Sequence, residues 1–401
     1  MIKGNAVIGQ SGGPTSVINS SLVGVLQEAS KCDFITGVYG MRWGIEGFMN
    51  EDVTDLKKEN PETIDGLRRT PSSALGSCRH KLKEEDFEPI LKMLKKYNIR
   101  YIFLIGGNDT MDTIHRVEKY CGENNYELIG IGIPKTVDND LFGTDHTPGY
   151  PSAARYVAMS VKQGGILARD MQKVDQIVIY QAVGRDSGWL AASSIAAKER
   201  EEDPPHLIYV PEVPFEDEKF LADVERCYKE YGWVSVSIGE GISYADKTPV
   251  TSSTVRDKFQ NIEFGAMGGV SSAMVLHRMA CNKFDFRGEF QVVESLQMCG
   301  ADRVSEVDVD EAYRCGVEAV KLAAEGKTGL MVTLVRDASP EYHCSIGTIE
   351  LEKAAEGAKP MPDEFIAPSG SMVTQAFIDY IKPLVGELPR YYNLDFNKVS
   401  I

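Results

Sequence analysis

Hydrophobic and polar residues follow two alternating patterns along the first third of the chain. Apolar runs typical of buried strands occupy 4–10, 34–40, 101–107 and 127–134. Amphipathic segments with helical spacing lie between them, at about 16–29 and through Phe87, Ile90, Leu91 and Leu94. Strands separated by helix-length segments pair in parallel, so this region predicts βαβ units with helices packed on a mainly parallel sheet.

The same alternation continues through the rest of the chain. Further strands are predicted at 175–184, 206–212, 233–242 and 289–297, and further helices at 216–231 and 308–325. The chain has 401 residues, 43% of them hydrophobic, which is enough for two cores. No repeat or long linker marks a boundary, and the change of pattern near Tyr150 is the best candidate. We expect one domain to contain 1–150 plus about 292–330, and the other 151–291 plus about 331–401.

Composition excludes several classes of function. The net charge of −16 argues against a nucleic-acid partner, because binding a phosphate backbone requires basic stripes. No apolar run approaches the roughly 20 residues that span a bilayer, and the N-terminus lacks a signal-peptide layout, so we expect a cytoplasmic protein without membrane contact. The eight cysteines form no C-x-x-C pair and the six histidines no H-E-x-x-H, so neither a disulfide framework nor a zinc site is indicated.

The first strand is followed by a turn with paired glycines. In VIGQSGGPTSVINSS, Gly12 and Gly13 separate the strand from a helix that would open with Thr15 and Ser16. Glycine lets backbone N–H groups approach an anion closely, and a helix N-terminus adds partial positive charge. The segment is a candidate phosphate cradle. It matches neither the Walker loop nor G-x-G-x-x-G, and a turn that uses glycine only for its dihedral angles is the structural alternative.

A second strand ends in the same way. LIGGNDTMDT places Gly107, Asn108, Asp109 and Thr110 between a strand and a helix. Asn108 and Asp109 are candidate Mg²⁺ ligands, whereas the structural alternative is that Asp109 or Thr110 caps the helix. Because ligands bind at the carboxyl ends of parallel strands, two such loops predict a shared phosphate-binding edge.

The third strand end carries the most charge. In GIPKTVDND, Lys135, Thr136, Asp138 and Asp140 follow a buried apolar strand, and Pro134 prevents a helix from continuing it. Phosphoryl transfer needs cations on the transferring oxygens and a carboxylate that accepts the proton of the acceptor hydroxyl. Lys135 and Asp138 can supply these groups. The structural alternative is that the Asp-Asn-Asp run caps a turn.

Three charged residues elsewhere fit the same chemistry. Arg79 in LGSCRHKL and Arg185 in VGRDSGW suit phosphate oxygens, although exposed arginines are commonly solvated surface residues. Glu240 follows the strand in WVSVSIGEGI and can accept a hydrogen bond from a sugar hydroxyl. These residues are site candidates only in combination with the three strand ends.

Together these motifs resemble the phosphofructokinase family, and within it the pyrophosphate-dependent branch. The similarity extends over most of the chain and is most specific in SGGPTSVIN, GGNDTMDT, PKTVDNDLFGTDHTPG and GRDSGWLAA. The resemblance implies two Rossmann-like three-layer α/β domains of the phosphofructokinase type, with the active site in the cleft between them. The first predicted domain would then bind the phosphoryl donor and the second the acceptor sugar.

The resemblance also indicates the donor. ATP-using relatives have glycine at the positions of Asp109 and Lys135, so it implies that Asp109 stands where the α-phosphate of ATP would lie and that Lys135 binds pyrophosphate. A carboxylate repels a nucleotide phosphate, and a lysine favours a compact polyanion. The expected donor is pyrophosphate with Mg²⁺, and the expected donor-binding residues are Gly12, Gly13, Arg79, Gly107, Asn108, Asp109, Thr110, Lys135 and Thr136.

For the acceptor, the resemblance implies that Asp138 is the general base, assisted by Lys135 and Arg185. The implied reaction is the reversible phosphorylation of the 1-hydroxyl of fructose 6-phosphate to fructose 1,6-bisphosphate, a step of glycolysis. The expected acceptor-binding residues are Thr136, Asp138, Asp140, Gly184, Arg185 and Glu240. The resemblance further implies a homodimer or homotetramer, in which a neighbouring subunit contributes to the acceptor site.

The acceptor side departs from the family pattern. Met298 follows the retained Gln297 in place of an arginine, Glu289 falls where an arginine that grips the sugar 6-phosphate is expected, and Val183 lies in an altered motif. Losing a charged hydrogen bond to phosphate costs about 1.5–3 kcal/mol. One alternative is therefore the same donor with another sugar phosphate, sugar or polyol. A non-catalytic regulatory paralogue is the second, because Asn108 replaces a metal-binding aspartate of many relatives. Cations close in sequence that could compensate are Arg278, Lys283, Arg287 and Arg303.

Overall fold

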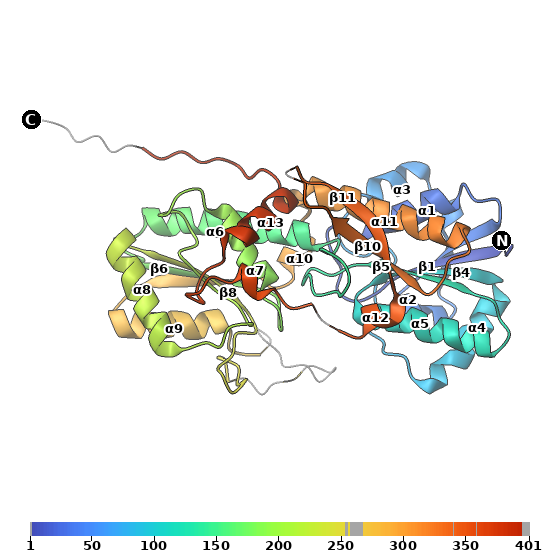
Figure 1. The fold of residues 1–401 in the computed structure, drawn as a ribbon, viewed down its shortest axis with the longest axis horizontal. Coiled ribbons are helices and arrows are strands. Elements are labelled where there is room, and N and C mark those ends of the chain that lie inside the picture. The colour runs from blue at the N-terminus through green and yellow to red at the C-terminus, as the bar shows by residue number, and fades with distance from the viewer. Residues whose placement is uncertain (1, 253–255, 257–267, 340, 358, 395–401) are drawn as a thin grey trace, which may run out of the picture.

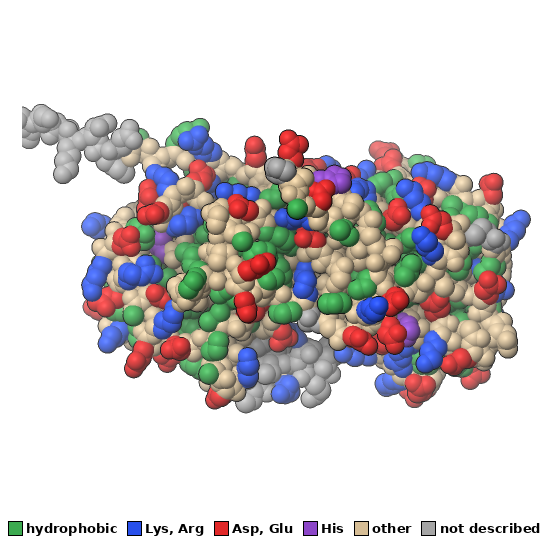
Figure 2. Space-filling view, in the orientation of Figure 1, with side chains coloured by type: hydrophobic (Ala, Val, Ile, Leu, Met, Phe, Trp, Pro, Cys, Tyr) green, Lys and Arg blue, Asp and Glu red, His purple; other side chains and the backbone are tan. Residues whose placement is uncertain are grey.

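The computed structural model describes residues 2–252, 256, 268–339, 341–357 and 359–394, which form two α/β domains, each around its own sheet (Figure 1). The predicted fold class is confirmed. Within the described ranges, no helix combines the length and apolar character needed to cross a bilayer. Acidic and basic side chains intermingle over the face shown in Figure 2, where the described residues form no continuous basic stripe.

The first sheet has seven strands in the order β11-β10-β5-β4-β1-β2-β3. Their bounds are β1 (Gly4–Gln10), β2 (Ile35–Met41), β3 (Val53–Asp55), β4 (Ile99–Gly106), β5 (Ile129–Pro134), β10 (Leu330–Arg336) and β11 (Cys344–Glu350). The strands are parallel except for the edge strands β3 and β11. Since β1, β4 and β5 are neighbours, the three predicted loops begin side by side at the carboxyl ends of these strands.

Helices cover both faces of the first sheet. One face is covered by α1 (Ile18–Ala29), α3 (Pro61–Leu67) and α11 (Glu306–Ala324), and the other by α2 (Gly44–Met49), α4 (Phe87–Lys96), α5 (Asn108–Glu123) and α12 (Leu351–Ala355). α1 and α11 cross at two glycines. A β-carbon on Gly24 would lie 2.2 Å from the Tyr313 carbonyl oxygen, and one on Gly316 would lie 2.1 Å from that of Ser21, so only glycine permits this approach.

The second sheet has four parallel strands in the order β7-β8-β6-β9. They are β6 (Ile177–Ala182), β7 (Leu207–Tyr209), β8 (Val234–Gly239) and β9 (Gly288–Val292). One face is covered by α6 (Tyr150–Asp170), α7 (Trp189–Ser193) and α13 (Gln375–Val385), and the other by α8 (Asp217–Tyr231) and α9 (Ser272–Phe284). Single 3₁₀ turns lie at Leu56–Lys58, Glu84–Asp86, Ser194–Ala197, Ala301–Arg303 and Asp363–Phe365.

The predicted division into domains was wrong at its C-terminal end. β10, β11 and α12 were expected in the second domain, but they complete the first, because β10 pairs with β5 through Leu330 opposite Ile131 and Met331 opposite Gly132. β11 then pairs with β10 along its whole length. The first domain therefore extends to about residue 355 before the chain returns to the second.

The strand predicted at 289–297 is also shorter than expected. β9 ends at Val292, because Glu294 adopts a left-handed backbone conformation with φ of 45° that breaks an extended strand. The short helix α10 (Leu296–Cys299) follows. Met298 therefore lies on a helix and not at the end of a strand.

Candidate active site

The first glycine turn is tied to the third strand end. Gly12 has a φ of 76°, which favours glycine, and its N–H donates to the Cys78 carbonyl oxygen at 3.0 Å. The Lys135 ammonium donates to the Gly13 carbonyl oxygen at 2.8 Å. α1 begins only at Ile18, later than the predicted opening at Thr15 and Ser16. The backbone groups that a ligand would meet at this strand end therefore belong to the turn and not to the N-terminus of the helix.

The second loop has the predicted arrangement. β4 ends at Gly106, and α5 begins at Asn108, so the side chains that follow Gly107 lie on its first turn. The Asn108 amide nitrogen donates to the Gly357 carbonyl oxygen at 2.9 Å. Asp109 pairs with Lys81 at 3.3 Å, and both side chains are about three-quarters exposed. Neither Asp109 nor Thr110 is the N-cap residue, since that position is Gly107.

These loops enclose a cavity of about 470 Å³, the donor pocket. Every predicted donor residue lines it: Gly12, Gly13, Arg79, Gly107, Asn108, Asp109, Thr110, Lys135 and Thr136. The lining also includes His80 and Lys81, which follow Arg79 in the LGSCRHKL segment, and Asp186, which had not been predicted. The pocket thus combines two glycine turns with the cationic side chains of Arg79, Lys81 and Lys135.

A second cavity of about 700 Å³, the acceptor pocket, lies next to it. The two pockets share Arg79, Asp140 and Asp186. Of the predicted acceptor residues, Asp138, Asp140, Gly184, Arg185 and Glu240 line the second cavity. Thr136 lines only the first, and its hydroxyl accepts a hydrogen bond from the Asp138 N–H at 3.1 Å, so it shapes the loop that carries the base.

Burial shifts the pKa values of charged side chains near the boundary between the two pockets. It lowers the pKa of Lys135 to about 8, even though the carboxylates of Asp138 and Asp140 favour the ammonium form. Burial, together with the neighbouring carboxylate of Asp140, raises the pKa of Asp138 to about 7. A carboxylate with this pKa can accept and release a proton near neutral pH.

Glu240 and Gly184 are joined by a hydrogen bond in the lining of the acceptor pocket. The Gly184 N–H, on a residue with φ of 130°, donates to the Glu240 carboxylate at 3.2 Å. Burial raises the pKa of Glu240 to about 7. This carboxyl group is therefore placed to exchange hydrogen bonds with hydroxyl groups of a ligand.

Two of the three residues that depart from the family pattern lie in the acceptor pocket, and the third lies outside it. Val183 and Met298 line the acceptor pocket, but Glu289 lies exposed on the edge strand β9, where it accepts a hydrogen bond from Gln291. A β-carbon at Gly13 would lie 2.8 Å from the terminal methyl carbon of Met298, so this side chain sits at the boundary of both pockets. Gln297 is buried, and its side chain accepts from the Val183 N–H at 3.2 Å.

None of the four compensating cations proposed from sequence, Arg278, Lys283, Arg287 and Arg303, is among the described residues that line the acceptor pocket. Arg303 instead donates to Ser160 at 2.8 Å. The pocket contains Lys359, whose ammonium donates to the carbonyl oxygens of Thr144 at 3.0 Å and Asp145 at 2.6 Å. Lys359 lies more than 200 residues beyond these partners, in a segment without a recognisable motif, so sequence reasoning missed it.

The donor pocket offers few ligands for a metal. In the described part of the chain, no group of three or more His, Cys, Asp or Glu side chains is arranged to hold an ion. Mg²⁺ nevertheless needs only one or two protein carboxylates when phosphate oxygens and water complete its shell. Asp109 and the amide oxygen of Asn108, side by side on the first turn of α5, fit an ion that arrives with a phosphate ligand.

Two α/β domains with contiguous pockets at their strand ends make this a two-domain α/β protein with adjoining ligand pockets. A family model described as "Phosphofructokinase" matches residues 5–323. The chain belongs to the phosphofructokinase family, as its motifs predicted.

Individual relatives cover almost the whole chain. It is 37% identical over 406 residues to a pyrophosphate–fructose 6-phosphate 1-phosphotransferase of Rhodospirillum rubrum, covering 100% of this chain and 99% of that protein. It is 35% identical over 366 residues to a sulfofructose kinase of Alkalicoccus urumqiensis, covering 90% and 91%. The crystal structure of a pyrophosphate-dependent phosphofructokinase from Marinobacter aquaeolei matches with a TM-score of 0.87 and 35% identity, covering 98% of this chain and 94% of that one.

Proposed function

We propose that this protein is a pyrophosphate-dependent phosphotransferase that phosphorylates the 1-hydroxyl of fructose 6-phosphate. The observation that carries this proposal is the position of Lys135, a buried ammonium bound to the Gly13 carbonyl oxygen inside the donor pocket and beside the carboxylate of Asp138. Relatives that are similar over their full length carry the name of this activity.

Lys135 and Asp109 favour a compact donor. The buried ammonium is desolvated, which strengthens its attraction for the oxygens of pyrophosphate. Asp109, which pairs with Lys81, adds a carboxylate to the lining of the same pocket. A nucleotide would have to bring a further charged phosphate past this carboxylate, which disfavours ATP.

Asp138 acts as the general base. Its carboxylate takes the proton of the acceptor hydroxyl, the hydroxyl oxygen forms a bond to the nearer phosphorus atom of pyrophosphate, and the bridging P–O bond breaks to release inorganic phosphate. Lys135 and Arg79 neutralise charge on the transferring oxygens. The bond broken and the bond formed are similar in kind, so the reaction runs in both directions.

Magnesium would be held by Asp109 and Asn108 together with donor oxygens, where it neutralises charge on the phosphoryl group. Arg185 and Glu240, which line the acceptor pocket, would contact the acceptor sugar. We also propose a homodimer or homotetramer, supported by the exposed edge strand β9, on which Phe290 is 40% exposed. Light scattering after gel filtration tests the assembly.

The proposed activity is tested with purified protein and Mg²⁺, crossing pyrophosphate and ATP with fructose 6-phosphate, sedoheptulose 7-phosphate, unphosphorylated sugars and polyols. Efficient turnover of fructose 6-phosphate with pyrophosphate is expected. Turnover with ATP alone would contradict the donor assignment. Binding of pyrophosphate without turnover of any acceptor would instead support a regulatory paralogue.

A second candidate keeps the donor and changes the acceptor. Val183 and Met298 present apolar side chains to the acceptor pocket, and a relative of similar identity is named sulfofructose kinase. A sugar with a different substituent at the far end would suit such a lining. Under this alternative, fructose 6-phosphate has a high KM, and Met298→Arg lowers it by supplying a charged hydrogen bond. An unchanged KM in Met298→Arg would remove its basis.

A further inference from the structure

The segment that carries the proposed base has little regular structure of its own. Residues 135–149, the interdomain loop, connect β5 of the first domain to α6 of the second. Lys135 is held at one end by Gly13. At the other end, the N–H of Gly149 donates to Asp308 on α11 at 2.8 Å. The position of Asp138 between these ends therefore depends on side chains that fasten the loop.

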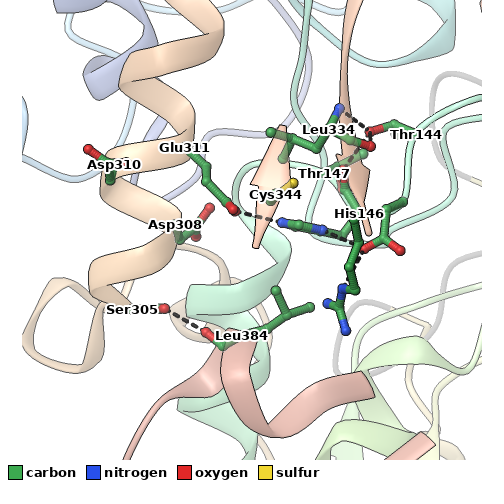
Figure 3. Close-up of polar contacts among 12 residues, drawn as sticks. Thr144, His146, Thr147, Ser305, Asp308, Asp310, Glu311, Leu334, Cys344 and Leu384 are labelled. Carbon is green, nitrogen blue, oxygen red and sulfur yellow. Dashed lines mark hydrogen bonds and ion pairs between the residues drawn. The ribbon is translucent and has the colours of Figure 1, made fainter. Parts of the chain in front are cut away.

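His146 is the most deeply buried ionisable group of this loop. Its side chain is fully buried, with Nδ1 2.8 Å from an Asp145 carboxylate oxygen and Nε2 2.7 Å from a Glu311 carboxylate oxygen. Figure 3 shows Glu311 directed from α11 toward the imidazole ring, while Asp310 on the same helix points away. The ring thus links the interdomain loop to α11, one of the helices that cover the first sheet.

The two contacts determine the charge of the ring. A carboxylate accepts hydrogen bonds but has none to donate, and a neutral imidazole has only one N–H group. Both nitrogens face carboxylates, so both must donate, and the ring is an imidazolium. Burial alone would lower the pKa of His146, but the hydrogen bonds to Asp145 and Glu311 outweigh it and raise the pKa above its ordinary value.

Charged and titratable groups on the surrounding elements complete a balanced cluster. Arg336 on β10 pairs with Asp145 at 3.3 Å, and Tyr342 donates to Glu311 at 2.6 Å. Two cations, His146 and Arg336, therefore face two carboxylates. The other titratable groups that pack around this cluster include Tyr150, Asp308, Arg314, Cys315, Cys344, Lys359 and Tyr380.

The cluster reaches the proposed base through hydrogen bonds. The hydroxyl of Tyr380 on α13 donates to the Asp145 carbonyl oxygen at 3.1 Å and accepts from the Asn139 amide at 3.0 Å. Asn139 is fully buried, has a left-handed φ of 54°, and lies next to Asp138 in the chain. Loss of the His146 contacts would therefore loosen the side-chain anchor of Asn139, and through it displace Asp138.

We propose that His146 is a positioning residue, which as an imidazolium bridging Asp145 and Glu311 holds the interdomain loop so that Asp138 faces the acceptor. This inference rests on the proposed function for its catalytic consequence. It concerns kcat more than donor binding, because Lys135 is fastened separately to Gly13. A displacement of about 1 Å at a reacting group can cost about 100-fold in rate.

The test combines hydrogen–deuterium exchange of the peptide covering 135–149 with steady-state kinetics, for the wild type, His146→Gln, Glu311→Gln and the control Asp310→Asn. Asp310 lies beside Glu311 on α11, is 61% exposed and pairs only weakly with Arg314 at 3.9 Å. His146→Gln should speed exchange in the loop but not in β8, and lower kcat about 10- to 100-fold with the pyrophosphate KM within about twofold. Asp310→Asn should match the wild type.

Glu311→Gln separates positioning from simple packing. A neutral ring can donate to Asp145 and accept from the new amide, so the fold is retained while the imidazolium is no longer required. In the wild type, kcat should fall as the pH rises through the raised pKa of His146, and Glu311→Gln should move this limb by about one pH unit or more. An unmoved limb would overturn the inference, and this variant also decides it if His146→Gln fails to fold.

The exchange measurement keeps this inference distinct from the proposed function. If the wild type shows no pyrophosphate-dependent turnover but His146→Gln still loosens the loop selectively, the positioning role stands and the proposed function fails. Unchanged exchange together with unchanged kcat in His146→Gln would overturn the positioning role and leave the proposed function intact.

Discussion

The donor and acceptor pockets share a boundary, yet they are assembled in different ways. The donor pocket is formed largely by short loops that follow the adjacent strands β1, β4 and β5. The acceptor pocket is formed by residues from six separate stretches, 79, 137–140, 183–187, 240, 294–298 and 359–360. The donor pocket thus depends mainly on neighbouring strands of one sheet. The acceptor pocket depends on the packing of the two domains and of a segment that is distant in sequence.

Asp138 lines the acceptor pocket, and its loss should have the largest effect on the reaction. Asp138→Asn removes the proton acceptor but keeps the shape of the side chain, so kcat should fall about 100- to 10,000-fold. Steady-state kinetics at saturating substrates measure this effect. Calorimetric titration should show pyrophosphate bound as in the wild type, and an activity comparable with the wild type would place the base elsewhere.

Lys135→Gly should sharpen the difference by damaging only the donor side. Losing one or two charge-assisted hydrogen bonds costs about 1.5–3 kcal/mol each, so the KM for pyrophosphate should rise about 10- to 100-fold. The KM of the acceptor should remain within about twofold. A larger effect on the acceptor than on pyrophosphate would show that the two pockets do not function separately. Initial rates with each substrate varied in turn measure both constants.

Apart from the alkaline fall in kcat expected from His146, the pH profile should show one limb for each pocket. Asp138 must be ionised to accept a proton, so kcat should fall about tenfold per pH unit below its pKa of about 7. Lys135 must be protonated to attract pyrophosphate, so kcat/KM for pyrophosphate should fall as the pH rises above its pKa of about 8. A pyrophosphate KM that stays constant across the alkaline range would contradict the role of Lys135.

Lys81→Ala is the matched control for Lys135 and should have the smallest effect. Lys81 also lines the donor pocket, but it is 74% exposed and its pair with Asp109 is a surface ion pair worth about 0–1 kcal/mol. The KM for pyrophosphate should change by less than about fivefold. An effect as large as that of Lys135→Gly would mean that the exposed charge of Lys81 contributes as much to pyrophosphate binding as the buried ammonium of Lys135.

The same contrast explains what the sequence could and could not predict. Turns at strand ends are encoded within a few residues, so the sequence could bring Gly12, Gly107 and Lys135 together, and all three line one cavity. Lys359 reaches its partners through the tertiary fold, and no local pattern marks it. Glu289 was assigned by alignment to the acceptor, whereas the chain places it on an exposed edge strand, outside the described lining of the acceptor pocket.

The error in the domain boundary has a similar cause. The run that forms β10 is apolar enough for either sheet, and only its pairing with β5 decides the matter. Conversely, the helices predicted at 216–231 and 308–325 agree with α8 and α11 within two residues, because amphipathic periodicity is a local property.

The return of β10 and β11 to the first sheet also has a consequence for synthesis of the chain. β5, complete at Pro134, has an open edge until Leu330 and the residues after it leave the ribosome. All four strands of the second sheet emerge in the meantime. The nascent protein must therefore build most of one domain beside an unfinished other, with an apolar strand edge available for pairing with the wrong partner.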